Sequence, residues 1–216
     1  ATFTMYDAHN VLYQNCISID SGDADPTKFG QMYGGFFFEN KGTTPDDNSG
    51  KLQGCIILNV AALSSVLDYK CNGNRAIVDT VAWHVQGGMQ HGNLCATPGG
   101  CEPPLFPHPN PSIAKLSHLT FGDIWGTRQD YSNVWGIGVY FDTGLLGDSS
   151  VTDTLVTGAK SGGILNLVVG DYRAFHKNGT DYANTFGVQP PKPGDHDLRV
   201  DPKMKYITRI EADSPL

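Results

Sequence analysis

The residues best suited to chemistry are acids and histidines in the middle of the chain. Asp79 stands inside the apolar run 77–85, and a carboxylic acid buried in such a run keeps its proton, as a general acid requires. His84 and His91 lie on either side of Met89 and a Gly-Gly pair, and two imidazoles with a thioether can bind copper or haem iron. Their spacing fits no metal motif, so one strand histidine and one loop histidine are the simpler interpretation. The candidate catalytic residues are Asp79, His84 and His91, and no metal is predicted.

A second kind of chemistry is suggested by residues 125–135, where aromatic and polar side chains alternate. Aromatic rings can stack on the apolar face of a sugar, while amides and carboxylates bond its hydroxyl groups. The simpler interpretation of the segment is a hairpin connection whose rings belong to the core. The predicted ligand contacts are Trp125, Arg128, Asp130, Tyr131 and Asn133.

Three carboxylates, Asp20, Asp23 and Asp25, occupy a glycine-containing turn. Oxygen ligands of this kind suit Ca²⁺, but the spacing differs from that of an EF-hand loop. A solvated turn is the preferred interpretation, calcium is the weaker one, and no cofactor is expected. A Ser-His-Asp triad has no support either, because the chain lacks a G-x-S-x-G elbow.

The chain contains 5 cysteines. Cys95 and Cys101 flank a Pro-Gly-Gly turn that lets the two thiols meet, so we predict a disulfide there. Cys55 and Cys71, on neighbouring predicted strands, form the second predicted pair. Cys16 is then left over, either as a small buried hydrophobe or as half of an intermolecular bridge.

Composition favours a secreted protein. The sequence Asn178-Gly179-Thr180 is an N-glycosylation acceptor and also a strong hairpin turn. Together with the cysteines it favours an oxidising compartment, and the start at Ala1 is compatible with a cleaved signal. A net charge of -7 without basic clusters argues against nucleic-acid binding. No apolar run is long enough to span a membrane.

The elements that must position these residues are strands. Only three of the 22 acids are Glu, and Asp favours turns over helix interiors. Alternating apolar residues predict strands joined by hairpins at Asn72-Gly73 and Asn178-Gly179, with no internal repeat. We expect one all-β domain over 1–216, an antiparallel β-sandwich or barrel of jelly-roll type, interrupted by a long Pro/Gly-rich loop at 86–112. Strands are expected at 2–6, 10–19, 31–39, 51–59, 65–71, 75–85, 113–121, 133–142, 151–157, 163–169, 171–177, 183–188 and 203–211.

Three functions fit these features. The leading hypothesis is a secreted, lectin-like domain that binds a glycan or cell-surface polysaccharide through the 125–135 segment. The first alternative is a self-assembling extracellular subunit that forms a homo-oligomer by strand exchange or a disulfide. The second is a secreted enzyme acting on polysaccharide or on a small apolar substrate.

Overall fold

The structure is a computed structural model of residues 1–216. It describes residues 2–6, 8, 10–22, 33–39, 49–62, 64–69, 74–91, 113–126, 136–141, 148–165, 169–183, 191–207, 209–210 and 214.

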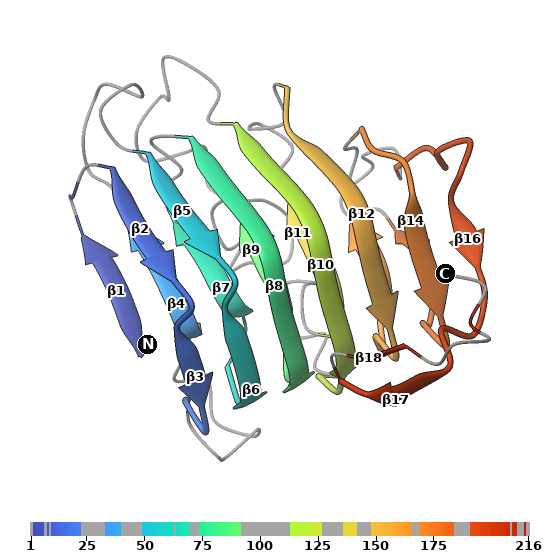
Figure 1. Ribbon diagram of the computed structural model, residues 1–216, viewed down its shortest axis with the longest axis horizontal. Helices are drawn as coiled ribbons and strands as arrows, with labels where there is room; N and C mark the ends of the chain where they lie inside the picture. The colour runs from blue at the N-terminus through green and yellow to red at the C-terminus, as the bar shows by residue number, and fades with distance from the viewer. Residues whose placement is uncertain are drawn as a thin grey trace, which may run out of the picture.

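Nearly all regular structure lies in two layers of strands (Figure 1). Sheet A has seven strands: β1 (Phe3–Tyr6), β4 (Tyr33–Glu39), β7 (Ser64–Tyr69), β9 (Met89–His91), β11 (Ile137–Phe141), β13 (Gly162–Leu165) and β15 (Tyr182–Ala183). Sheet B has nine: β2 (Val11–Gln14), β3 (Ile17–Ile19), β5 (Gly50–Gln53), β6 (Ile56–Val60), β8 (Arg75–Val85), β10 (Ala114–Ile124), β12 (Ser150–Thr157), β14 (Arg173–His176) and β16 (Leu198–Arg199). A small hairpin, β17 (Met204–Tyr206) and β18 (Arg209–Ile210), follows.

Every strand pair within sheets A and B is parallel. The chain visits the two sheets alternately, and each visit adds the next strand along the same direction, so the strands of sheet B run in chain order across Figure 1. The molecule is therefore a parallel β-solenoid, in which each coil contributes one rung to each sheet. The predicted antiparallel sandwich or barrel is wrong.

The error concerns which strands pair with each other, not where the strands lie in the sequence. The strands on either side of Asn72-Gly73 are β7 and β8, and those on either side of Asn178-Gly179 are β14 and β15. In both cases the two strands belong to different sheets, so neither turn closes a hairpin. Alternating hydrophobicity marks a half-buried strand whether its neighbours are parallel or antiparallel, and the parallel partners lie a whole coil away.

A six-residue unit repeats once in each of six coils, contrary to the expectation of no repeat. It reads Asn-Cys-Ile-Ser-Ile-Asp at 15–20, Gly-Cys-Ile-Ile-Leu-Asn at 54–59, Asp-Thr-Val-Ala-Trp-His at 79–84, His-Leu-Thr-Phe-Gly-Asp at 118–123, Asp-Thr-Leu-Val-Thr-Gly at 153–158 and Tyr-Arg-Ala-Phe-His-Lys at 172–177. The first and last residue of every unit has positive φ, between 48° and 70°. Each unit thus bends the chain at both ends, and the units are in register along sheet B.

These bends form two rows that run across the rungs. The first left-handed row contains Asn15, Gly54, Asp79, His118, Asp153 and Tyr172, and the second contains Asp20, Asn59, His84, Asp123, Gly158 and Lys177. Gly, Asn and Asp dominate both rows because they tolerate this backbone conformation best. Asp79 and His84 therefore occupy corner positions of one coil.

Between the bends, side chains alternate between core and surface. Ile57, Ala82, Phe121, Val156 and Phe175 point inward from equivalent positions on neighbouring rungs and are buried. Sheet A supplies the facing apolar row of Phe36, Val66, Met89, Val139 and Ile164. Each large apolar side chain buried in this way contributes about 1.5–3 kcal/mol.

Cys16 and Cys55 occupy the same inward position on neighbouring rungs, and both are free thiols. Cys55 is buried and donates to the Tyr13 carbonyl oxygen at 3.5 Å. Burial raises the pKa of the Cys55 thiol. The predicted Cys55–Cys71 disulfide is therefore wrong, because Cys55 is a free thiol that lies beside Cys16. Cys71, Cys95 and Cys101 lie outside the described residues, and those that are described form no disulfide.

Candidate functional site

The outer face of the repeated units is a narrow apolar strip between the two left-handed rows. The third residue of each six-residue unit points outward. These residues form one row across the rungs: Ile17, Ile56, Val81, Thr120, Leu155 and Ala174. The next outward row consists of Ile19, Leu58, Trp83, Gly122, Thr157 and His176. Because the flanking rows are rich in Asn, Asp and His, the strip has polar groups along both edges.

Trp83 is the largest side chain on this strip. Its neighbour on the next rung is Gly122, and a Cβ atom built on Gly122 would lie 2.0 Å from Cζ3 of the Trp83 indole. The indole therefore covers the position that a side chain at 122 would fill. Trp83 is partly exposed, so one part of the ring packs on the sheet while another part faces solvent.

Beside Trp83, the second left-handed row places an imidazole next to a carboxylate. His84 Nδ1 lies 2.6 Å from Asp123 Oδ2, and the two side chains are 54% and 48% exposed. Their neighbours on the earlier rungs are Asn59 and Asp20, and the Asn59 amide donates to the Asp20 carboxylate. The row is thus a line of exposed hydrogen-bonding groups at the spacing of a sheet, about 4.8 Å per rung.

Trp125 adds a second indole to this group. Its ring centroid is 6.2 Å from that of His84, at an interplanar angle of 38°. Its Nε1 atom is buried and has no hydrogen-bond partner among the described residues. The next residue, Gly126, lies so close to the Gln86 carbonyl that a Cβ atom would approach it to 2.3 Å, which fixes the chain after β10. Trp83, His84, Asp123 and Trp125 together are called the aromatic site below.

Farther along the solenoid, the chain covers the same strip itself. The β17–β18 hairpin crosses the lower ends of β10 and β12 in Figure 1. Met204 and Ile207 line a groove of about 350 Å³ together with outward residues of sheet B and three members of the first left-handed row: His118, Asp153 and Tyr172. Among the described residues, the uncovered part of the strip is therefore its N-terminal half, where Ile17 and Ile19 are more than half exposed, and this half ends at the aromatic site.

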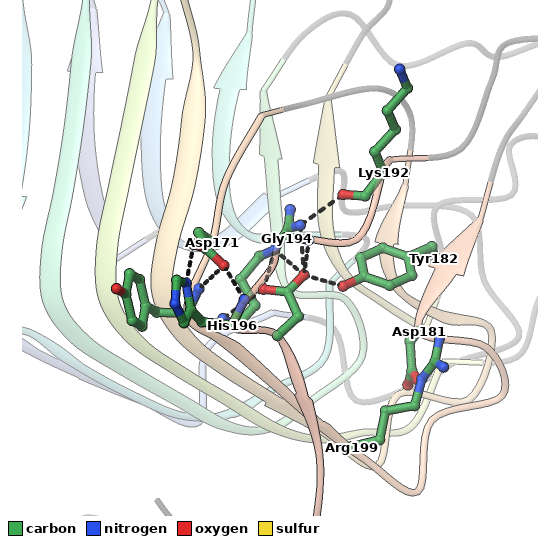
Figure 2. Close-up of polar contacts among 10 residues, drawn as sticks. Asp171, Asp181, Tyr182, Lys192, Gly194, His196 and Arg199 are labelled. Atoms are coloured by element: carbon green, nitrogen blue, oxygen red, sulfur yellow. Dashed lines mark hydrogen bonds and ion pairs between the residues drawn. The ribbon is translucent and has the colours of Figure 1, made fainter.

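The last coil is closed by a buried ion pair (Figure 2). The Arg173 side chain is 0% exposed, and its Nη2 lies 2.7 Å from Oδ2 of Asp197, whose side chain is 6% exposed. Asp197 also accepts from the Gly194 amide and the Tyr182 hydroxyl, and Arg173 donates to the Lys192 carbonyl oxygen. Burial alone would raise the pKa of Asp197, but the bonds from Arg173, Tyr182 and the backbone amides hold it below its usual range. This network fastens residues 191–199 to the end of the core.

A second, more exposed ion pair lies beside this buried network. His196 Nδ1 is 2.7 Å from Asp171 Oδ2, and the His196 ring stacks on Tyr172 with centroids 4.5 Å apart. Bonds from the His196 side chain and amide lower the pKa of Asp171 to about 2, and the same carboxylate raises the pKa of His196. Figure 2 shows Asp171 and His196 next to the buried network, so the pair belongs to the closure of the last coil.

The structure brings together two of the predicted site residues, His84 and Trp125, which were assigned to different sites. Asp79 does not have the burial that its predicted acid role required, because it is an exposed member of the first left-handed row. The backbone of His91 pairs with those of Asp68 and Phe141 in sheet A. Arg128, Asp130, Tyr131 and Asn133 lie outside the described residues. Trp83 and Asp123 were missed, although the repeated unit could have revealed both.

Two further predictions concern ligands and modification. Asp20 is bonded to Asn59, while Asp23 and Asp25 lie outside the described residues. Within the described ranges, no group of three or more His, Cys, Asp or Glu side chains is placed to hold a metal ion. The Asn178 Nδ2 atom donates to the Val156 carbonyl oxygen and to Asp181 Oδ1, and Asn178 Oδ1 accepts from the Ala159 amide. A glycan on Nδ2 would remove one of these donors, so the structure gives glycosylation no support.

Comparison with known proteins adds no relative. No protein-family model, curated protein or solved structure matches the chain. In addition, no helix among the described residues is long and apolar enough to cross a membrane.

Proposed function

We propose that this chain binds carbohydrate on the outer face of sheet B, at the aromatic site formed by Trp83, His84, Asp123 and Trp125. The observation that carries the proposal is the position of Trp83, whose indole covers Gly122 on an open apolar strip beside a line of exposed polar groups. A ring held in this way offers a flat apolar surface at a low entropic cost, since the sheet already fixes it.

The second left-handed row supplies the hydrogen-bonding groups that bind sugar hydroxyls, which the indole ring face lacks. A carboxylate accepts hydrogen bonds from sugar hydroxyls, and amide and imidazole groups donate or accept them. Asp20, Asn59, His84 and Asp123 present such groups on four successive rungs. An extended chain of sugars lying along the solenoid would meet them at regular intervals, whereas a compact ligand would meet only one or two.

The proposal retains part of the sequence-based hypothesis. Trp125 stays in the predicted ligand set, while Arg128, Asp130, Tyr131 and Asn133 remain predicted contacts. An extracellular location also remains a proposal, motivated by the low charge and the Asn- and Asp-rich surface.

A glycan array followed by variants tests the function. Wild-type chain should bind one or more oligosaccharides, and Trp83→Ala should reduce affinity by on the order of tenfold or more, because fully burying a large apolar side chain is worth about 1.5–3 kcal/mol and a tenfold change about 1.4 kcal/mol. Trp83→Phe keeps a ring and should retain part of the affinity. The matched control is Tyr206→Ala, which removes an exposed aromatic residue from the β17–β18 hairpin. Equal losses in Trp83→Ala and Tyr206→Ala, or no glycan bound by the wild type, would reject the proposal.

An enzymatic role is the second candidate, favoured by the short contact between His84 and Asp123. A carboxylate bonded to Nδ1 orients an imidazole, which leaves Nε2 free to face a bound substrate as a general acid or base. If the site acts on polysaccharide, the wild type releases new reducing ends from the glycan it binds. His84→Ala would abolish that release, and a wild type that binds without any release would eliminate this candidate.

A further inference from the structure

A second groove lies at the other end of the sheet B strands, where β2, β5, β8 and β10 begin. Its volume is about 560 Å³. Its lining includes the polar or charged residues Asn10, Ser49, Lys51, Asn74, Arg75 and Lys115. None of these belongs to the aromatic site, which lies at the far end of β8 and β10.

The register of the sheet places two lysines on one outward row of this groove. Lys51, Ala76 and Lys115 are partners on three successive rungs. Ala76 is too short to fill the space between its neighbours, so it forms a low floor with a lysine on either side. Two rungs of a parallel sheet span about 9–10 Å, which sets the spacing of the two lysine backbones.

The charge of the groove is opposite to that of the molecule. The chain has a net charge of -7, yet among the described residues every charged side chain that lines the groove is a cation: Lys51, Arg75 and Lys115. Arg75 is 2% exposed, donates to the Asn74 carbonyl oxygen and lies over the Phe38 ring, so its charge is fixed beneath the floor. Lys115 donates to the backbone carbonyl of Asp148, which orients it at the rim.

We propose that this groove binds an anionic polysaccharide, with the acidic groups of separate sugar residues paired to Lys51 and Lys115. The spacing of the two lysines favours a polymer whose negative charges lie on separate sugar residues over a single small anion. A single phosphate is normally held by donors that converge on it, whereas these two lysines arise about 9–10 Å apart on opposite sides of an alanine. Asn10, Ser49 and Asn74 along the edge provide amide and hydroxyl groups for the sugar hydroxyls.

Calorimetric titration with defined oligosaccharides tests this site. The probes are a short oligo-uronide, its carboxyl-reduced neutral counterpart, a sulfated oligosaccharide of similar length, and inorganic phosphate. The wild type should bind an acidic probe more tightly than the neutral one, and its affinity should fall as salt is added. Selective binding of the uronide identifies carboxylate as the recognised group, and selective binding of the sulfated probe identifies sulfate; either result supports the proposal.

The variants assign the binding to the lysines. Lys51→Ala and Lys115→Ala should each weaken acidic-probe binding by on the order of tenfold, the loss of one charge-assisted bond. Lys51→Arg should retain most of the affinity. Lys160→Ala, which removes an exposed charge elsewhere, is the control and should change it little. Lys51→Ala should leave unchanged the binding of a neutral oligosaccharide at the aromatic site, so this site and the aromatic site can fail separately.

Three results would overturn the proposal. They are equal binding of the acidic and neutral probes, equal effects of Lys51→Ala and Lys160→Ala, and lysine-dependent binding of phosphate as tight as that of the acidic oligosaccharides. Failure of the wild type to bind any acidic probe at low salt would overturn it as well.

Discussion

Asp197 is the residue on which closure of the last coil depends. It is nearly buried and receives bonds from Arg173, Tyr182 and two backbone amides, those of Arg173 and Gly194. Removing one partner of a buried ion pair leaves the other charge uncompensated, so Asp197→Asn should lower the free energy of unfolding by about 3–5 kcal/mol. Denaturant unfolding measures this, with Asp195→Asn as an exposed control that should change stability by less than about 0.5 kcal/mol. Equal midpoints for the two variants would show that the network does not hold residues 191–199 on the core.

The neighbouring pair, Asp171 and His196, should make the stability of this closure depend on pH. The folded pKa of His196 is raised, so its contribution to stability is complete below the unfolded value near 6.5 and is lost as pH rises through the folded value. The folded pKa of Asp171 is lowered to about 2, so its contribution is present above about pH 4 and is lost only as pH falls toward 2. Between these limits both groups are charged.

An NMR titration of His196 tests this coupling. In Asp171→Asn the His196 midpoint should fall toward about 6.5, since both main causes of its raised pKa come from Asp171. Asp195→Asn removes a weaker influence and should shift the midpoint less. An unchanged midpoint in Asp171→Asn would contradict the geometry of the pair.

The repeated six-residue unit is the element that shapes sheet B. Its bends need positive φ, which costs an ordinary L-residue about 1–2 kcal/mol and a β-branched one more. Asp79, with φ of 52°, is therefore a structural corner. Asp79→Val should lower the free energy of unfolding by at least about 1–2 kcal/mol, while Asp79→Asn and Asp79→Gly should be tolerated. Thermal unfolding of the three variants checks this, and an equal loss in all three would point to a role for the carboxylate itself.

The sequence predicts most strand positions but not their partners. The alternation of apolar and polar residues predicted the positions of β8 and β10 closely, because between the bends every second side chain of these strands points into one continuous core. Partner choice depends on residues one coil away, and the coils differ in length, so no fixed period appears along the chain. The pairs of bends five residues apart were the available signal, since Asp20, Asn59, His84 and Asp123 end equivalent units. Recognising them would have placed His84 beside Asp123, and Trp83 beside Gly122.

As a whole, the molecule presents an open first coil. Leu12, Ile17 and Ile19 are 51–55% exposed, and among the described strands β2 and β3 each pair on one side only. Such an edge can pair with another chain, which is what the self-assembly alternative requires. That alternative predicts concentration-dependent dimers or larger species in light scattering, and Ile17→Lys should abolish them. A monomer at all concentrations for the wild type would remove it.

The central claim is that the outer face of sheet B binds carbohydrate at Trp83. The chain has 3 Trp, so their indole N–H resonances can be followed individually in an NMR titration with an oligosaccharide selected on the array. The account predicts that the Trp83 and Trp125 resonances shift with saturation, and that Asp123→Ala weakens the binding they report. An oligosaccharide that binds without shifting the Trp83 resonance would contradict the account.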